Sequence, residues 1–183
     1  GVEVPFLRPP AFSTDTSTDR DFLVHAMEWF YENEQQRPEY WVHLRPTTRL
    51  RNPLLIDQAI KTIEGKKEST SLRSVHKAPE TPFKWFKKDH NGNLKGILSE
   101  EHKTESYNLP KESFEDIFIP DGYVDIVKRS FVMTHNTIHG DRMIGFELPP
   151  CTEVDSLAEF EYIQYQVDKH GSPLLDYLDS YIF

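Results

Sequence analysis

The stretch from residue 40 to residue 76, YWVHLRPTTRLRNPLLIDQAIKTIEGKKESTSLRSVH, decides the fold class. It opens with Tyr40–Leu44, a short aromatic and β-branched run that is typical of a buried strand. Residues 52–65 begin with an Asn-Pro helix start and carry apolar side chains at helical spacing. Ser71–His76 is predicted to be a second strand. This order predicts a β-α-β unit with a right-handed parallel crossover, and hence a parallel α/β fold.

Regular elements are also predicted on both sides of this unit. Asp21–Tyr31 has apolar residues at helical spacing behind a cluster of capping residues, so it is predicted to be a helix. Tyr123–Val127 and Met143–Leu148 are predicted strands. Ser156–Glu159 is a capping box, which predicts the start of a final helix.

The regular pattern stops between Lys77 and Pro120. Prolines, a turn-like segment at His90–Asn93 and the aromatic cluster Phe83–Phe86 replace periodic apolar residues there. We interpret residues 77–120 as an insertion or arm. The aromatic cluster is expected to belong to a core or a subunit interface.

Composition limits the function classes. A chain of 183 residues with 37% hydrophobic and 28% charged residues can bury the core of one globular domain. Its net charge of -9 would repel a phosphate backbone, so nucleic-acid binding is not expected. Cys151 is the single cysteine, which excludes an internal disulfide framework and favours a reducing cytoplasm. No apolar run approaches the roughly 18 residues of a membrane helix, and no membrane partner is expected.

Two acids precede the last predicted helix. If Glu153–Asp155 is extended, strand alternation puts both carboxylates on one side, at the edge of the sheet where α/β folds bind ligands. Paired carboxylates suit Mg²⁺, which prefers oxygen ligands and shares its coordination with phosphates. The alternative is that the acids only favour the positive end of the helix.

The loop Arg45–Arg51 holds three arginines and two threonines, a composition that suits an anionic substrate. The alternative is a solvated loop with a helix cap, since the glycines of a phosphate cradle are absent. His139–Asp141 is interpreted as a turn, because no second histidine stands at ligand spacing. Cys151 has no local signature of a nucleophile.

Five segments, in order, resemble motifs of one enzyme family. Gly1–Pro9 resembles G-A-E-V-P-F-x-R-P, and His43–Arg51 resembles L-[QR]-P-T-[ST]-P-L-R with its preceding residue. Ser71–Val75 is similar to S-V-R-S-V, Asp121–Tyr123 to N-G-x-[YV], and Glu153–Asp155 to a magnesium-binding D-I-D. Together they resemble acylneuraminate cytidylyltransferases, the CMP-sialic acid synthetase family, and most closely its bacterial members acting on legionaminic-type nonulosonic acids.

The resemblance implies a Rossmann-like α/β fold with a mostly parallel sheet of the nucleotide-diphospho-sugar transferase type. Residues 1–183 would form a single domain, with residues 77–120 as a protruding dimerisation arm. The family's opening third, a strand and a glycine-rich loop of the form L-A-x-R-x-G-S-K that grips the CTP phosphates, is absent. We therefore expect the chain to match the carboxyl two-thirds of such an enzyme and to be inactive alone.

The implied reaction transfers CMP from CTP to a nonulosonic acid with release of pyrophosphate, in a cytoplasmic homodimer. The residues that the resemblance assigns are Arg8 and Asp155 as catalytic, Arg45, Thr47, Arg51 and Asp121 as substrate-binding, and Glu153 with Asp155 as Mg²⁺ ligands.

The sequence departs from the family at several of these positions. Arg45 stands where Gln is common, Arg49 where Pro is usual, Asp121 in place of Asn and Glu153 in place of Asp. The preference for base and sugar is therefore open. Two alternatives stay open. One is a non-catalytic fragment or dimeric interaction module of this fold, and the other is a related sugar nucleotidyltransferase with another base or acid sugar.

Overall fold

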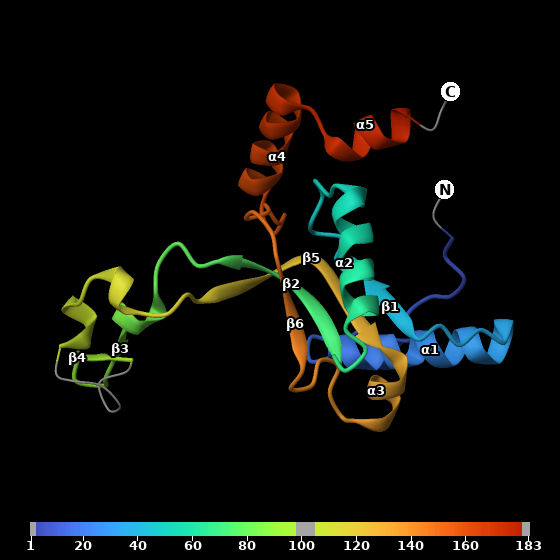
Figure 1. Ribbon diagram of the computed structural model, residues 1–183, viewed down its shortest axis with the longest axis horizontal. Helices are drawn as coiled ribbons and strands as arrows, with labels where there is room; N and C mark the ends of the chain where they lie inside the picture. Colours follow the sequence, from blue (N-terminus) through green and yellow to red (C-terminus); the bar gives the residue numbers. More distant parts are fainter. Residues whose placement is uncertain (1–2, 98–104, 181–183) are drawn as a thin grey trace.

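A four-stranded sheet forms the centre of the computed structural model, which describes residues 3–97 and 105–180 (Figure 1). In spatial order β1-β5-β2-β6, its strands are β1 (Tyr40–His43), β5 (Phe118–Lys128), β2 (Ser71–Lys77) and β6 (Met143–Glu147). Each strand includes most or all of a segment that was predicted to be extended. The kinds of element are thus confirmed.

The arrangement of the strands corrects the prediction of a mostly parallel sheet. β2 pairs in parallel with β6, but β5 runs antiparallel to both β1 and β2 and separates them. The helix α2 (Pro53–Gly65) joins two strands of the same direction that are not neighbours. The physical reason is the arm: the chain leaves the sheet from β2 and returns as β5, so these strands are the two legs of one long hairpin.

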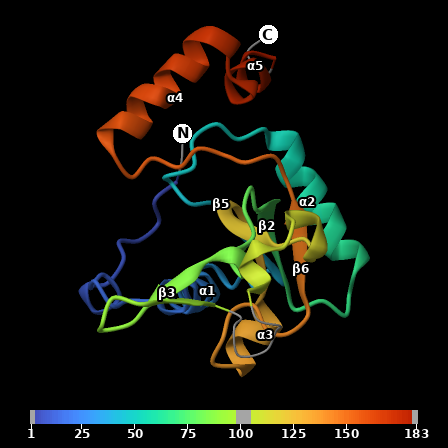
Figure 2. The same ribbon diagram turned by 90° about the vertical axis from the view of Figure 1, so that its left-hand side faces the viewer.

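Helices cover both faces of the sheet. α2, capped by Asn52, lies on one face, whereas α1 (Asp19–Glu34) and the short α3 (Arg129–Thr134) lie on the other (Figure 2). The predicted helix at Asp21–Tyr31 is present but longer, since α1 starts at Asp19, where Thr18 and Asp21 form a capping box. The core of the α2 face centres on Ala59, Ile63, Leu72, Val124 and Ile126, and that of the α1 face on Leu23, Met27, Val127 and Val132.

The segment between β2 and β5 projects away from the sheet as an arm (Figure 1). It holds a small hairpin of β3 (Phe86–Lys88) and β4 (Leu94–Gly96), whose turn includes Gly92 at a φ of 88°. Three short 3₁₀ helices lie beside the hairpin, at Pro82–Lys84, Ser106–Asn108 and Lys111–Ser113. Within the predicted aromatic cluster, Phe83 packs on Phe114 and Phe86 packs on Tyr107. Part of that cluster therefore makes ring contacts within the arm, although Phe86 stays exposed.

The chain ends in two helices that stand away from the sheet, α4 (Leu157–His170) and α5 (Pro173–Asp179) (Figure 1). α4 starts at the predicted place, with Ser156 as its N-cap. Another 3₁₀ helix, Pro10–Phe12, lies near the beginning of the chain. Among the described residues, no helix has the length and apolar character needed to cross a membrane.

Candidate active site

A bulge in β5 shapes the candidate site. Arg73 pairs with Asp125 and Val75 with Pro120, so residues 121–124 stand opposite Ser74 alone. The Ser74 hydroxyl donates to Asp121 Oδ1 at 2.5 Å and accepts the Val124 N–H at 3.0 Å. The buried serine thus holds the extra residues in place. Bulges commonly redirect residues next to active sites, and this one pushes the Asp-Gly-Tyr segment out of the ladder.

Gly122 is the point at which three segments distant in the sequence meet. Its N–H donates to Glu153 Oε1 at 2.6 Å. A Cβ atom at this position would lie 2.6 Å from the same oxygen, 2.7 Å from Thr48 Oγ1 and 3.0 Å from Arg45 Cδ. Glycine is required at this position because the side chains of Glu153, Thr48 and Arg45 approach the backbone too closely to leave room for a Cβ atom.

Arg51 braces the substrate loop from within. Its guanidinium donates to four backbone carbonyls: Tyr123 at 2.7 Å, Arg45 at 2.6 Å, Gly122 at 2.8 Å, and Thr48. These bonds leave at most one of its five N–H donors for a substrate. The structure shows Arg51 holding the loop and the bulge together, and the substrate-binding role that the resemblance implies for it stays a prediction. Burial lowers the pKa of Arg51 from its ordinary value.

Glu153 belongs to the site through backbone pairing as well as through its carboxylate. It forms an isolated antiparallel bridge with Thr48, and the Val154 N–H donates to the Thr47 carbonyl at 3.0 Å. The extended conformation predicted for residues 153–155 is assigned only at Glu153. Asp155 is exposed, and its N–H donates to Glu159 Oε2 at 2.9 Å at the start of α4.

The two carboxylates fit the donor chemistry of a Mg²⁺ ion. One carboxylate oxygen of Glu153 accepts the Gly122 N–H, which leaves the second oxygen for a metal ion, and the side chain of Asp155 is exposed to solvent. No group of three or more His, Cys, Asp or Glu residues able to hold a metal is found within residues 3–97 and 105–180. Mg²⁺ commonly takes one or two protein carboxylates and completes its shell with water and substrate phosphates.

Asp121 is buried in the bulge and supports it. Besides Ser74, its Oδ1 accepts the Tyr123 N–H at 3.1 Å, and its Oδ2 lies 3.5 Å from His76 Nδ1. A direct contact of Asp121 with substrate would require it to leave these partners. The sequence analysis did not identify Ser74 and His76 as partners of Asp121. The two residues are two positions apart on β2, so their side chains lie on the same face of the strand, and this spacing is the signal that could have related them.

Arg8 and the head group of Arg45 lie on the α1 face of the sheet. The Arg45 guanidinium pairs with Asp19, whereas the Cδ atom of the same side chain would lie 3.0 Å from a Cβ atom at Gly122. Arg8 is exposed and places its guanidinium 4.4 Å from the centre of the Phe22 ring. Thus Arg45, Thr47, Arg51, Asp121 and Glu153 gather around the bulge, whereas Asp155 is placed at its exposed rim and Arg8 is placed against α1.

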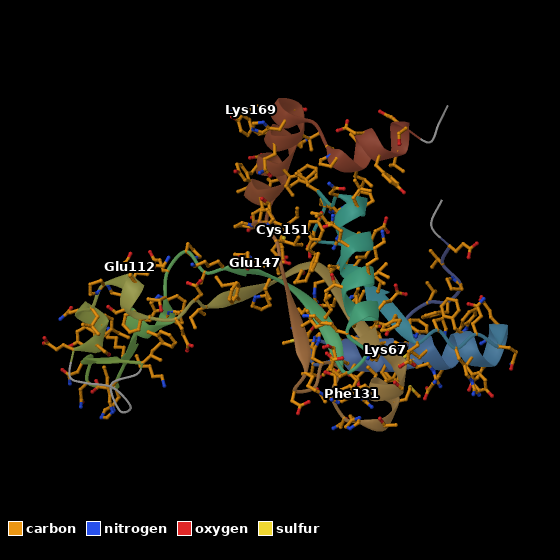
Figure 3. All side chains as sticks on the ribbon, in the orientation of Figure 1. Lys67, Glu112, Phe131, Glu147, Cys151 and Lys169 are labelled. Atoms are coloured by element: carbon orange, nitrogen blue, oxygen red, sulfur yellow. The ribbon has the colours of Figure 1, made fainter. Side chains whose placement is uncertain are left out.

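Cys151 lies between the sheet and α4 (Figure 3). Burial, reinforced by Asp121 and Glu153, raises the pKa of its thiol to about 11. A thiol with this pKa is protonated at neutral pH, so Cys151 is not an activated nucleophile. This environment agrees with the absence of a nucleophile signature around Cys151 in the sequence.

Neither the protein-family models nor the curated proteins give a match to this sequence. The chain does share its fold with a solved structure. That solved structure is a CMP:2-keto-3-deoxy-manno-octonic acid synthetase complexed with CTP, with a TM-score of 0.54 and 9% sequence identity. The match covers 85% of this chain and 70% of that one.

Proposed function

We propose that this chain belongs to a nucleotidyltransferase that transfers CMP from CTP to an acid sugar, specifically a nonulosonic acid of the sialic or legionaminic type. The observation that carries the proposal is the meeting of the Arg45–Arg51 loop, Gly122 and Glu153 at one bulge. The fold shared with a CTP-bound synthetase supports it. The particular acid sugar rests on the resemblance of the sequence motifs.

In the proposed reaction the anomeric hydroxyl of the acid sugar attacks the α-phosphorus of CTP, and pyrophosphate leaves. Glu153 and Asp155 would hold Mg²⁺, which offsets negative charge on the transferring phosphoryl group. Arg51 keeps the loop and the bulge in one arrangement through its four carbonyl contacts. Thr47 and Arg45 lie on the loop that would receive the nucleotide. Positioning of this kind supplies much of the catalysis in phosphoryl transfer.

We also propose that the arm pairs two chains. Trp85 is 50% exposed and Leu94 is 64% exposed, so the arm leaves large apolar side chains uncovered. Lys84, Lys87 and Lys88 add positive charge to the same segment, which would suit anionic substrates bound to a second copy.

The function is tested by a CMP-sugar formation assay with CTP, Mg²⁺ and a panel of acid sugars. The panel includes sialic and legionaminic-type acids and 2-keto-3-deoxy-manno-octonic acid, and other nucleoside triphosphates replace CTP in parallel. The assay is run on this chain and on a longer protein that includes any coding sequence upstream. Formation of a CMP-sugar from CTP and at least one acid sugar, in preference to the other triphosphates, is the result expected of the proposed function.

The metal role is tested in the active protein with Asp155→Asn. Loss of one Mg²⁺ ligand is expected to lower Mg²⁺-dependent turnover at least about 100-fold with an unchanged circular dichroism spectrum. Asp57→Asn, which removes an exposed carboxylate on α2, is the matched control. Unchanged turnover of Asp155→Asn at ordinary Mg²⁺ would refute the metal assignment. If no triphosphate and acid sugar give product with any form of the protein, a non-catalytic interaction module is favoured.

A further inference from the structure

A buried carboxylate lies in the middle of the sheet, on the face covered by α1. Asp125 of β5 pairs with His43 of β1 on one side and with Arg73 of β2 on the other. Asp125 is 3% exposed. A strand position so deeply covered is normally apolar, because an ionised carboxylate is costly to remove from water without partners.

The partners of Asp125 form a chain of alternating charges. Its Oδ2 lies 3.6 Å from Arg45 Nη2, and its Oδ1 lies 3.4 Å from Arg73 Nε. Arg45 Nη2 also donates a hydrogen bond to Asp19, the first residue of α1, so its contact with Asp125 is the longer of the two ion pairs. The order Asp19–Arg45–Asp125–Arg73 therefore links α1, the substrate loop and two strands of the sheet.

This network is not fully satisfied. Asp125 Oδ1 and Arg73 Nε are both buried, and neither has a hydrogen-bond partner in the part of the chain that the structure describes. Unsatisfied buried polar groups are uncommon in native proteins, and they concentrate where a site needs them. Packing alone would be served better by apolar residues at these positions.

Arg45 connects the network to the candidate active site. Its head group is held on the α1 face, whereas its Cδ lies against Gly122 and its carbonyl accepts Arg51 at 2.6 Å. A shift of the guanidinium would therefore move the stem and the backbone that border the bulge. Asp125 therefore contacts the side chain that borders the bulge.

We propose that Asp125 is a positioning residue for the proposed cytidylyl transfer: by holding Arg45, it keeps the Arg45–Arg51 loop in the arrangement that receives CTP. The inference rests on the proposed function and deepens it. Asp125 is not a ligand of the substrate, and it acts through Arg45. Arg73 balances its second oxygen.

Protonation of Asp125 would release the same contact. Burial raises the pKa of Asp125, and the charges of Arg73, Arg45 and His43 oppose that rise. The titratable and charged groups facing the network are Asp19 from α1, His43 and Arg45 from β1 and its loop, Arg73 from β2, and His139 from the loop before β6.

A carboxylate with a raised pKa takes up its proton at a higher pH than usual, so the activity of the wild type should fall as the pH is lowered. The pH profile of Asp125→Asn should lack this decrease on the acid side.

The experiment uses the longest active form of the protein, with CTP, Mg²⁺ and its best acid sugar. Asp125→Asn is expected to lower kcat/KM for CTP about 10- to 100-fold, mainly through KM for CTP, while KM for the sugar stays within about two-fold. A merely structural role would reduce the active fraction without changing either KM. Asp57→Asn on α2 is again the matched control.

A double-mutant cycle separates action through Arg45 from any other route. If Asp125 acts through Arg45, the variant carrying both Arg45→Gln and Asp125→Asn should be no worse than Arg45→Gln alone, within about two-fold. Multiplied effects of the two changes would overturn the proposal.

Hydrogen exchange of residues 45–51, without substrate, distinguishes failure of this inference from failure of the proposed function. Faster exchange of these amides in Asp125→Asn than in the wild type and in Asp57→Asn is the expected result. Unchanged exchange overturns the positioning role whatever the activity. Absence of wild-type turnover, with faster exchange in the variant, overturns the proposed reaction and leaves Asp125 as the residue that orders the loop.

Discussion

Gly122 is the residue at which the candidate site is most sensitive to a single methyl group. Gly122→Ala would place a Cβ within 2.7 Å of both Glu153 Oε1 and Thr48 Oγ1. Glu153 would have to turn away, or the bulge would have to open. We expect Gly122→Ala to lower the free energy of unfolding by about 1–3 kcal/mol. We also expect CMP-sugar formation to fall under conditions in which the variant is still folded, because the change lies within the candidate site.

Urea denaturation and the CMP-sugar assay measure the two effects of Gly122→Ala. Gly145→Ala in β6 is a suitable control, because the nearest atom to its Cβ would be Val75 Cγ2 at 3.6 Å, an ordinary contact. Equal stability and activity of Gly122→Ala and the wild type would contradict the close approach described here.

His139 is a residue whose burial predicts a dependence of stability on pH. Burial, reinforced by Arg73, lowers the pKa of His139 to about 4 from an ordinary value of 6.5. Between these values the unfolded chain binds more protons than the folded one, so stability falls as the pH falls. With solvent screening, the loss is on the order of 1–2 kcal/mol.

The measurement is the free energy of unfolding in urea, from neutral pH down to about pH 4. His139→Gln should lose less stability over this range than the wild type. His90→Gln, which changes an exposed histidine in the turn between β3 and β4, should follow the wild type. The burial argument for His139 is wrong if both variants show the same slope.

Among the elements, the arm can be removed with least damage to the sheet. At its root the Ala78 N–H donates to the Ile117 carbonyl at 2.8 Å, and Lys77 pairs with Asp116 at 2.6 Å. Since β2 and β5 are antiparallel, an Asn-Gly turn in place of residues 79–116 would join them as an ordinary hairpin.

We expect this shortened protein to fold and to be monomeric, and the protein with its arm to be dimeric. Sedimentation at high micromolar concentration gives the mass of each form, and circular dichroism checks that the shortened sheet is intact. A monomeric protein with its arm present, or a dimer that survives the deletion, would contradict the proposed pairing role.

At the scale of the whole molecule, an acidic chain is proposed to bind two anionic substrates. The net charge of -9 opposes this, so positive charge must be concentrated locally. Asp19 and Asp125 balance the charges of Arg45 and Arg73, so this network adds no net positive charge near the candidate site. The three lysines of residues 84–88 lie on the projecting arm, and under the proposed pairing they would add positive charge to the site of a second copy.

The sequence by itself determined the kinds of element and the order of the motifs. The capping residues Thr18 and Ser156 act on near neighbours in the chain, and the apolar spacing of residues 53–65 is equally local. The structure has helices at all three places. The turn at Gly92 is equally local. Local chemistry of this kind is independent of the rest of the fold.

Only the tertiary structure decided the sheet order and the roles of individual site residues. The return of the arm puts β5 between β1 and β2, and the bulge at residues 121–124 appears only when β5 is paired with β2. The four carbonyls around Arg51 and the guanidinium groups around Asp125 come from separate segments. Such contacts depend on strand register and backbone direction over long separations, and residue type alone does not specify either.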